Sequence, residues 1–114
     1  AIGYRGTWAK AWSTAYLGGA VHYTRASGAT ARLAFSGTSV AWIGPAGPGR
    51  GRSAVYLDGV LVATVDESAS SFVARRVLFA RNVPSGAHTL VIKALGTSGR
   101  PMVALDALYV VAPG

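Results

Sequence analysis

Short runs in which apolar and polar residues alternate recur along the chain, and glycines and prolines separate them at intervals of roughly 8 to 12 residues. In the run ATARLAFSG, residues 29–37, a period of two places Ala31, Leu33 and Phe35 on one face. Later runs are expected to point these side chains inward in the same way: Val55, Leu57, His88, Leu90 and Ile92. No long segment keeps the spacing of an amphipathic helix, so the pattern is typical of an all-β sandwich or barrel.

These runs predict nine β-strands: residues 7–12, 20–26, 29–37, 39–44, 53–58, 60–66, 72–81, 87–95 and 104–111. The Asp-Gly pair at 58–59 lies between two of them and supplies the positive φ angles of a two-residue hairpin turn. Further turns are expected at 84–86 and at Gly18-Gly19. The longest irregular stretch is GPAGPGRGR, residues 44–52, and loops of this kind carry function more often than strands do.

Length and composition favour one folded domain, residues 1–114. With 51% hydrophobic and 13% charged residues, the chain is too apolar for intrinsic disorder. It has no cysteine, which excludes a disulfide framework and a thiolate nucleophile. No apolar run approaches the roughly 18 residues of a membrane span, so none is expected. The first residues lack the basic start and apolar middle of a signal peptide.

The net charge of +7 comes from 11 Lys plus Arg against 4 Asp plus Glu. The cations are spread along the chain without a run of five or six, so no nucleic-acid partner is predicted. Two interpretations of the excess stay open. It reflects either a shortage of acids or a preference for acidic partners, which a positive surface field attracts.

Groups suited to catalysis are few. Asp66 and Glu67 are neighbours, so in a strand they point to opposite faces and cannot act as paired carboxylates. The loop at 44–52 lacks the Lys-Ser/Thr ending of a P-loop. His22 and His88 make a poor zinc site by themselves, and hydrogen-bonded strand histidines are the simpler expectation. We therefore expect no enzyme activity, no cofactor and no metal.

Aromatic and arginine residues carry the remaining functional signal. Sugar rings stack their C–H faces on Trp or Tyr, and Arg donors suit their hydroxyls and carboxylates. A carbohydrate site is therefore predicted from Trp12, Tyr16 and Tyr23 beside the Gly18-Gly19 turn, with Arg50 and Arg52 from the glycine-rich loop. The alternative is packing for the aromatic residues and solvated charge for the arginines. Two other tryptophans are expected in the core: Trp8 and Trp42.

Several segments together resemble a known family. The succession YRGTW, GGAVHYT, FSGTSVAWIGP, VYLDG, GAHTL and LDAL is similar to galactose-binding-like domains attached to secreted bacterial glycoside hydrolases and other cell-surface enzymes. The resemblance covers nearly the whole chain. It implies a jelly-roll sandwich of two antiparallel sheets that serves as an accessory module of the carbohydrate-binding type.

Domains of this family often hold a structural calcium ion between acidic residues of the first and last strands. Asp106 matches the last-strand aspartate, but AIGYRG offers no acidic partner, so no metal is carried over. Asp66, after the second hairpin strand, also looks family-like, and there it would bond loop backbone.

The resemblance, together with the scarcity of catalytic groups, predicts a non-catalytic carbohydrate-binding module of a larger extracellular enzyme. Its partners would be a polysaccharide or glycan, an acidic one if the positive charge is functional, and the catalytic domain of the parent enzyme in cis. The alternative function is a structural or protein-interaction spacer in a multidomain chain. Nucleic-acid binding is the least favoured class, because the sequence has no basic cluster.

Overall fold

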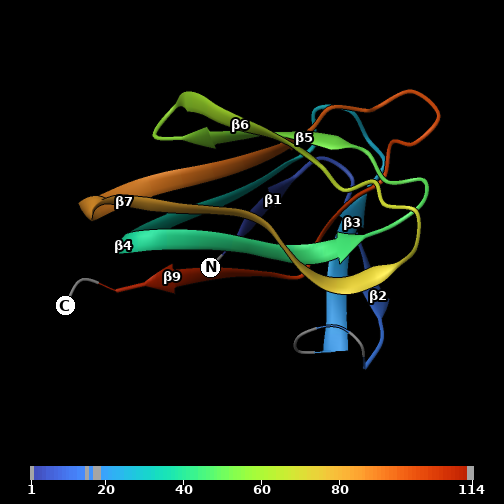
Figure 1. The fold of residues 1–114 in the computed structure, drawn as a ribbon. Coiled ribbons are helices and arrows are strands. Elements are labelled where there is room, and N and C mark those ends of the chain that lie inside the picture. Colours follow the sequence, from blue (N-terminus) through green and yellow to red (C-terminus); the bar gives the residue numbers. More distant parts are fainter. Residues whose placement is uncertain (1, 15, 17–18, 113–114) are drawn as a thin grey trace.

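Two long strands organise the fold. In the computed structural model, which describes residues 2–14, 16 and 19–112, β4 (Thr30–Ala46) and β7 (Val73–Ala94) pair antiparallel along almost their whole length. Figure 1 shows both strands turning back together at one end of the molecule. The β4–β7 ribbon therefore contributes one half to each of two layers.

The first layer joins one half of this ribbon to three shorter strands: β1 (Gly3–Arg5), β5 (Arg52–Leu57) and β6 (Val60–Asp66). In the second layer the other half of the ribbon pairs with β9 (Ala107–Val111). Beside it lies a separate three-stranded sheet in the order β2 (Ala9–Trp12), β3 (Ala20–Thr24) and β8 (Val103–Leu105). All of the strand pairs are antiparallel. The all-β jelly-roll sandwich expected from the sequence is thus confirmed.

Glycine permits the bend in the ribbon. A Cβ atom at Gly37 would collide with the main chain of Val111, so only glycine lets β9 approach β4 at this point. On the opposite strand Gly86 has a φ of 142°, a conformation that L side chains rarely adopt. The turn predicted at 84–86 therefore exists as a sharp bend within β7.

The core lies between the two layers. Trp42 and Val40 of the second layer meet Val55, Leu90 and Ile92 of the first, and each of these side chains is at most 1% exposed. Six of the residues predicted to face inward pack in or against this core, as expected from the period of two: Ala31, Phe35, Val55, Leu57, Leu90 and Ile92. Leu33 and His88 are not part of it, and His88 instead bonds the hairpin turn. The prediction for the tryptophans is also confirmed, since Trp42 is fully buried and Trp8 packs against the core.

Strand boundaries differ from the sequence prediction in three ways. The runs at 29–37 and 39–44 merge into β4, and those at 72–81 and 87–95 merge into β7, because the bends preserve hydrogen-bonded pairing. The predicted last strand divides at Asp106, with β8 pairing β3 and β9 pairing β4. The strand β1 was not predicted, since three residues are too short to show a period.

The irregular stretch predicted at 44–52 is also shorter in the structure, because β4 continues to Ala46 and β5 begins at Arg52. Of the predicted Gly18-Gly19 turn, Gly18 lies outside the described residues. Across the described part of the chain, no helix has the length and hydrophobicity needed to cross a membrane.

A histidine joins the β5–β6 hairpin to the bend of β7. The hairpin turn has the predicted left-handed pair, with φ of 51° at Asp58 and 80° at Gly59. The Asp58 carboxylate lies 2.6 Å from His88 Nδ1 and accepts the Thr89 N–H at 2.8 Å. His88 Nε2 lies 2.6 Å from the Pro84 carbonyl oxygen. Since both neighbours are acceptors, the imidazolium form satisfies both contacts, and the hydrogen bond to Asp58 raises the pKa of His88.

We expect His88→Gln to destabilise the protein most below about pH 6.5, the ordinary histidine pKa. A histidine whose pKa is raised in the folded state stabilises the protein fully below its unfolded-state pKa. This contribution is lost as the pH rises through the folded-state pKa of His88. Thermal unfolding of the wild type and of His88→Gln from pH 5 to 9 measures this effect. The difference between their melting temperatures should narrow as the pH rises.

His22→Gln is the matched control, because burial and Lys10 lower the pKa of His22 and give its contribution the opposite pH dependence. A difference in melting temperature between wild type and His88→Gln that stays constant from pH 5 to 9 would contradict a charged His88 bound to Asp58.

Candidate functional site

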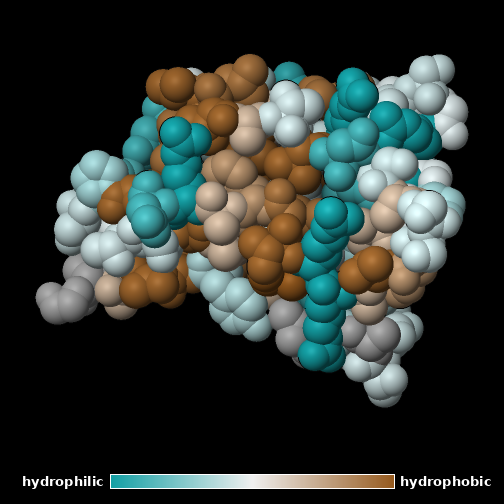
Figure 2. All heavy atoms as spheres, in the orientation of Figure 1, coloured by the Kyte–Doolittle hydropathy of each residue, from teal (hydrophilic) through white to brown (hydrophobic). Residues whose placement is uncertain are grey.

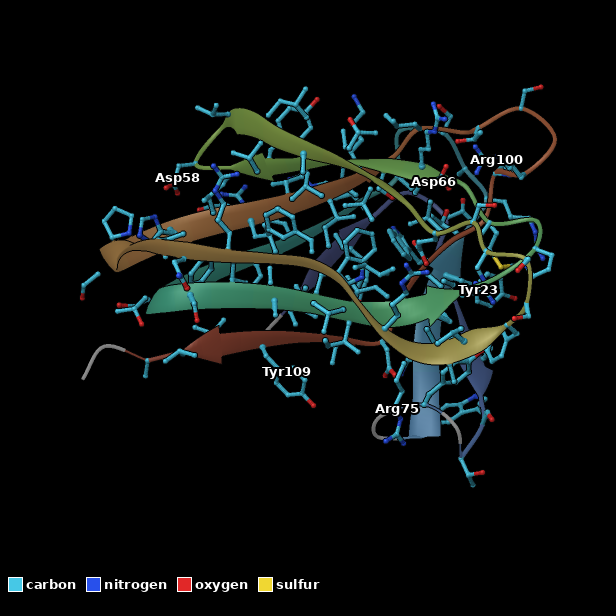
Figure 3. All side chains as sticks on the ribbon, in the orientation of Figure 1. Tyr23, Asp58, Asp66, Arg75, Arg100 and Tyr109 are labelled. Carbon is cyan, nitrogen blue, oxygen red and sulfur yellow. The ribbon has the colours of Figure 1, made fainter. Side chains whose placement is uncertain are left out.

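A hollow of about 200 Å³ brings together residues from the N-terminal strands and from two distant loops. Its aromatic walls are Tyr16 and Tyr23, and its cations are Arg25 and Arg50. The remaining lining is apolar: Ala11, Val21 and Met102. Figure 3 shows Tyr23 at the same end of the molecule as Asp66 and Arg100, with Asp58 at the other end.

The cations of the hollow are held against aromatic rings. The Arg25 guanidinium lies 5.4 Å from the ring centroid of Tyr23, and that of Arg50 lies 5.6 Å from the centroid of Phe72. Tyr16 meets the same phenylalanine edge to face at 6.4 Å. Arg50 Nη1 also approaches Met102 Sδ at 3.2 Å, which ties the loop carrying Arg50 to the segment before β8. These contacts restrict the side chains before any ligand binds.

The loop carrying Arg50 is anchored by a buried glutamate. Glu67 donates its N–H to the Gly51 carbonyl at 3.0 Å and accepts the Gly47 N–H at 2.9 Å. Its side chain is fully buried and accepts the Ala104 N–H at 3.0 Å. Burial raises the pKa of Glu67 to about 9, so the group is neutral at pH 7. Arg50 therefore keeps its positive charge uncompensated by this neighbour.

The adjacent carboxylate is ionised. Arg100 donates two N–H groups to the Asp66 carboxylate, at 2.7 and 3.2 Å, and Arg52 Nε lies 3.3 Å from the same carboxylate. These hydrogen bonds hold the pKa of Asp66 at about 2, with Arg100 the largest cause. Asp66 also accepts the Ser68 N–H at 2.9 Å, which is the loop-backbone bond predicted from the sequence. Asp66 is half-exposed and Glu67 is buried, so the two carboxyls do not act as a pair.

The structure brings together three of the five residues predicted for the site: Tyr16, Tyr23 and Arg50. Trp12 does not join them. Successive side chains of a strand point to opposite faces, so Ala11 shares the face of Tyr23, and Trp12 points away and is 73% exposed. Lys10 Nζ lies 5.6 Å from its ring. Arg52 also lies outside the hollow, on the first layer beside Asp66.

Sequence reasoning missed Arg25 and Met102 in the hollow and Phe72 beside it. Arg25 follows Tyr23 by two residues, a spacing that places both on one side of an extended segment and was an available signal. Met102 carried no such signal, because it meets Arg50 through an isolated parallel bridge between segments 52 residues apart. Among the described residues, no three His, Asp or Glu side chains gather as a metal site requires.

Comparison with known proteins gives relatives among carbohydrate-active enzymes. No family model matches the chain. Over 92 residues, the chain is 32% identical to an A type blood α-D-galactosamine galactosaminidase from Flavonifractor plautii, a match that covers 81% of this chain and 8% of the relative. The chain thus spans less than a tenth of this relative.

Solved structures show the same fold. One is an exo-β-1,3-galactanase from Phanerochaete chrysosporium in complex with β-1,3-galactotriose (TM-score 0.65, 19% identity, covering 94% of this chain and 26% of that one). Another is the CBM36-1 domain of a multidomain xylanase from the hindgut metagenome of Trinervitermes trinervoides (TM-score 0.58, 16% identity, covering 82% and 78%). The chain therefore has a jelly-roll fold of the kind that occurs in carbohydrate-active enzymes.

We expect Glu67→Gln to stabilise the protein at neutral pH. The folded chain keeps the proton of Glu67 above the ordinary pKa of 4.5, whereas the unfolded chain releases it, so wild-type stability falls as pH rises from 4.5 towards 9. Glutamine keeps the acceptor for Ala104 without this penalty. The gain should be on the order of 2–3 kcal/mol at pH 7 and vanish near pH 4.5, as measured by urea unfolding.

Asp66→Asn serves as the comparison, because its lowered pKa stabilises the folded state above the ordinary value and this contribution is lost in acid. A difference between Glu67→Gln and wild type that does not change with pH would contradict a buried neutral carboxyl.

Proposed function

We propose that the chain is a non-catalytic carbohydrate-binding module of a larger carbohydrate-active enzyme that works outside the cell. The observation that carries this proposal is the hollow with two tyrosines and two arginines around an apolar floor. The likeness to an α-galactosaminidase, a galactanase and a xylanase CBM36 domain supports the class of ligand.

The hollow suits one or two sugar units of a longer chain. Its volume of about 200 Å³ lies below the several hundred Å³ typical of pockets that enclose a whole small ligand. Tyrosine rings stack on the C–H face of a sugar, and the phenolic hydroxyls bond its oxygens. The small side chain of Ala11 lines the same hollow as Tyr16 and Tyr23 and takes up little of its volume.

An acidic sugar is favoured over a neutral one. Arg25 and Arg50 place two guanidinium groups at the hollow, and planar guanidinium donors match a carboxylate. Glu67 lies behind Arg50 but is protonated at neutral pH, so it does not compete for that cation. We therefore propose uronic acid units as the preferred ligand.

We propose no catalytic role for the hollow because of where the carboxyl groups lie. Glycoside hydrolysis by the usual route needs two carboxyl groups flanking one bond. The described lining of the hollow contains neither a carboxyl nor an imidazole. Asp66 is bound by Arg100, and Glu67 is fully buried. The chemistry would belong to a catalytic domain in cis, and tethering would strengthen weak binding through effective concentration.

A spacer role is the second candidate. Apolar surface gathers over the middle of the face seen in Figure 2, interrupted by hydrophilic side chains. On the second layer Val77, Tyr109 and Val111 are each more than half exposed. Such a face could pack against a neighbouring domain, and the ligand experiments below distinguish this role from sugar binding.

We expect Tyr23→Ala to weaken binding to the preferred polysaccharide by roughly 3- to 10-fold, the value of one aromatic stacking contact. Isothermal titration against galactan, xylan and polygalacturonate fragments measures the loss. Tyr109→Ala is the matched control, since this tyrosine is 54% exposed on β9 and does not line the hollow. Equal losses in both variants, or no binding of any glycan by the wild type, would favour the spacer.

Arg50→Gln should weaken binding of a trigalacturonate by about tenfold or more, because it removes a charge-assisted hydrogen bond. The affinity for a neutral trisaccharide should change far less. Arg81→Gln is the control, since Arg81 is exposed on β7 and does not line the hollow. Loss of neutral and acidic binding to the same degree would show that Arg50 acts by holding the loop.

A further inference from the structure

The outer face of the first layer carries cations in register across neighbouring strands. Directly paired residues share a face of the sheet. Arg5 of β1 pairs with Thr30, and Thr30 pairs with Lys93 of β7. Arg32 is two residues beyond Thr30 and therefore lies on the same face. That face is the outer one, because the intervening Ala31 is buried in the core.

Arg52 extends this set across a further strand. Lys93 pairs with Ala54, and Arg52 lies two residues before Ala54 along β5. A diagonal line of cations thus crosses the sheet through Arg32, Lys93 and Arg52. Each of these residues lies on the next strand and is displaced by two residues along it. Strands about 4.8 Å apart with a rise of about 3.3 Å per residue give roughly 8 Å for each step. We call these three residues the diagonal stripe, and Arg5 flanks it.

Most of the positive charge on this face is uncompensated. Within the described part of the chain, no ion pair involves Arg5, Arg32 or Lys93. The nearest carboxylate in register is Asp66, which pairs with Arg52 across β5 and β6 and is held more closely by Arg100. Asp66 thus contacts two cations, Arg52 and Arg100, and leaves the other described cations Arg5, Arg32 and Lys93 without an ion pair, which gives this face a positive field.

A second hollow and the ring of Tyr56 lie beside the stripe. Beside Arg5 and Arg32, a hollow of about 400 Å³ is lined by Thr30 and Val91 and opens over Gly3, which has no side chain to fill it. Tyr56 pairs with Val91, so its ring lies on the same face, next to the stripe. Guanidinium groups, a hydroxyl and an aromatic ring together match a sugar chain that carries anionic groups.

We propose that the diagonal stripe is a second binding surface, separate from the hollow at Tyr23, that takes an extended polysaccharide bearing carboxylate or sulfate groups. The cations follow a line across an open sheet, which fits an extended polymer. Their separation of roughly 8 Å suits a chain with spaced charges better than a duplex with a charge every 1.7 Å or so. This inference goes beyond the proposed function, because it concerns a different face and requires a polymer.

The test compares two double variants that each lower the net charge from +7 to +5 (7 − 2). Arg32→Gln with Lys93→Gln removes the stripe. Arg76→Gln with Arg81→Gln is the matched control, since both of these exposed arginines belong to the half of β7 in the second layer. Titrations at two salt concentrations use polygalacturonate, dextran sulfate, dextran, trigalacturonate and a DNA duplex. Arg5→Gln with Arg32→Gln, both exposed, replaces the first variant if that one fails to fold.

We expect the stripe variant to lose about fivefold or more in affinity for at least one of the two anionic polysaccharides, with a weaker salt dependence, while the control keeps it. Polygalacturonate against dextran sulfate shows whether carboxylate or sulfate is the recognised group. Trigalacturonate binding, which depends on the hollow, should survive in the stripe variant.

Equal losses in the two variants would overturn the proposal, because net charge alone would then explain binding. Tighter binding of DNA than of either polymer by the wild type would also overturn it. If Tyr23→Ala abolishes polymer binding and the stripe variant does not, the hollow is the sole site and only the second surface fails.

Discussion

The pairing of β4 with β7 is the constraint on which the rest of the structure depends. Because one ribbon supplies strands to both layers, its bend determines how the layers face each other and where the core lies between them. The positive φ of Gly86 permits this bend, and Gly37 opposite it leaves room for β9 to approach β4. The clamp between Asp58 and His88 holds the bend against the neighbouring hairpin.

The alternation of side chains then separates the two binding surfaces. Arg50 and Arg52 stand two residues apart, yet one points into the hollow of the second layer and the other lies on the outer face of the first. The change occurs at Gly51, whose N–H donates to the Met102 carbonyl and whose carbonyl accepts from Glu67. A Cβ atom at Gly51 would collide with the main chain of Arg100, so this crossing needs glycine.

Local patterns predicted much of the fold. The period of two identified the inward residues around Ala31 and Leu90, and the Asp-Gly pair located the hairpin, because both signals depend on neighbouring residues alone. The site was predicted only in part. Tyr16, Tyr23 and Arg50 were found together, but Trp12 faces away, and its direction depends on the register of β2 against β3. Met102 enters the hollow through a long-range bridge that leaves no periodic trace in the sequence.

The positions of the acidic residues explain why the excess positive charge is concentrated on the sheet face and at the hollow. Asp58 serves the hairpin, Asp66 is gripped by Arg100, and Glu67 is buried and neutral. Of these three carboxyls, only that of Asp66 contacts a cation of the sheet face, Arg52, and none belongs to the described lining of the hollow. Burial of the Glu67 side chain costs stability above its ordinary pKa. The main chain of Glu67 holds the loop of Arg50, and its neutral carboxyl does not cancel the charge of that arginine. Because the carboxyl beside this loop is neutral, Arg50 keeps the positive charge that would bind an anionic sugar.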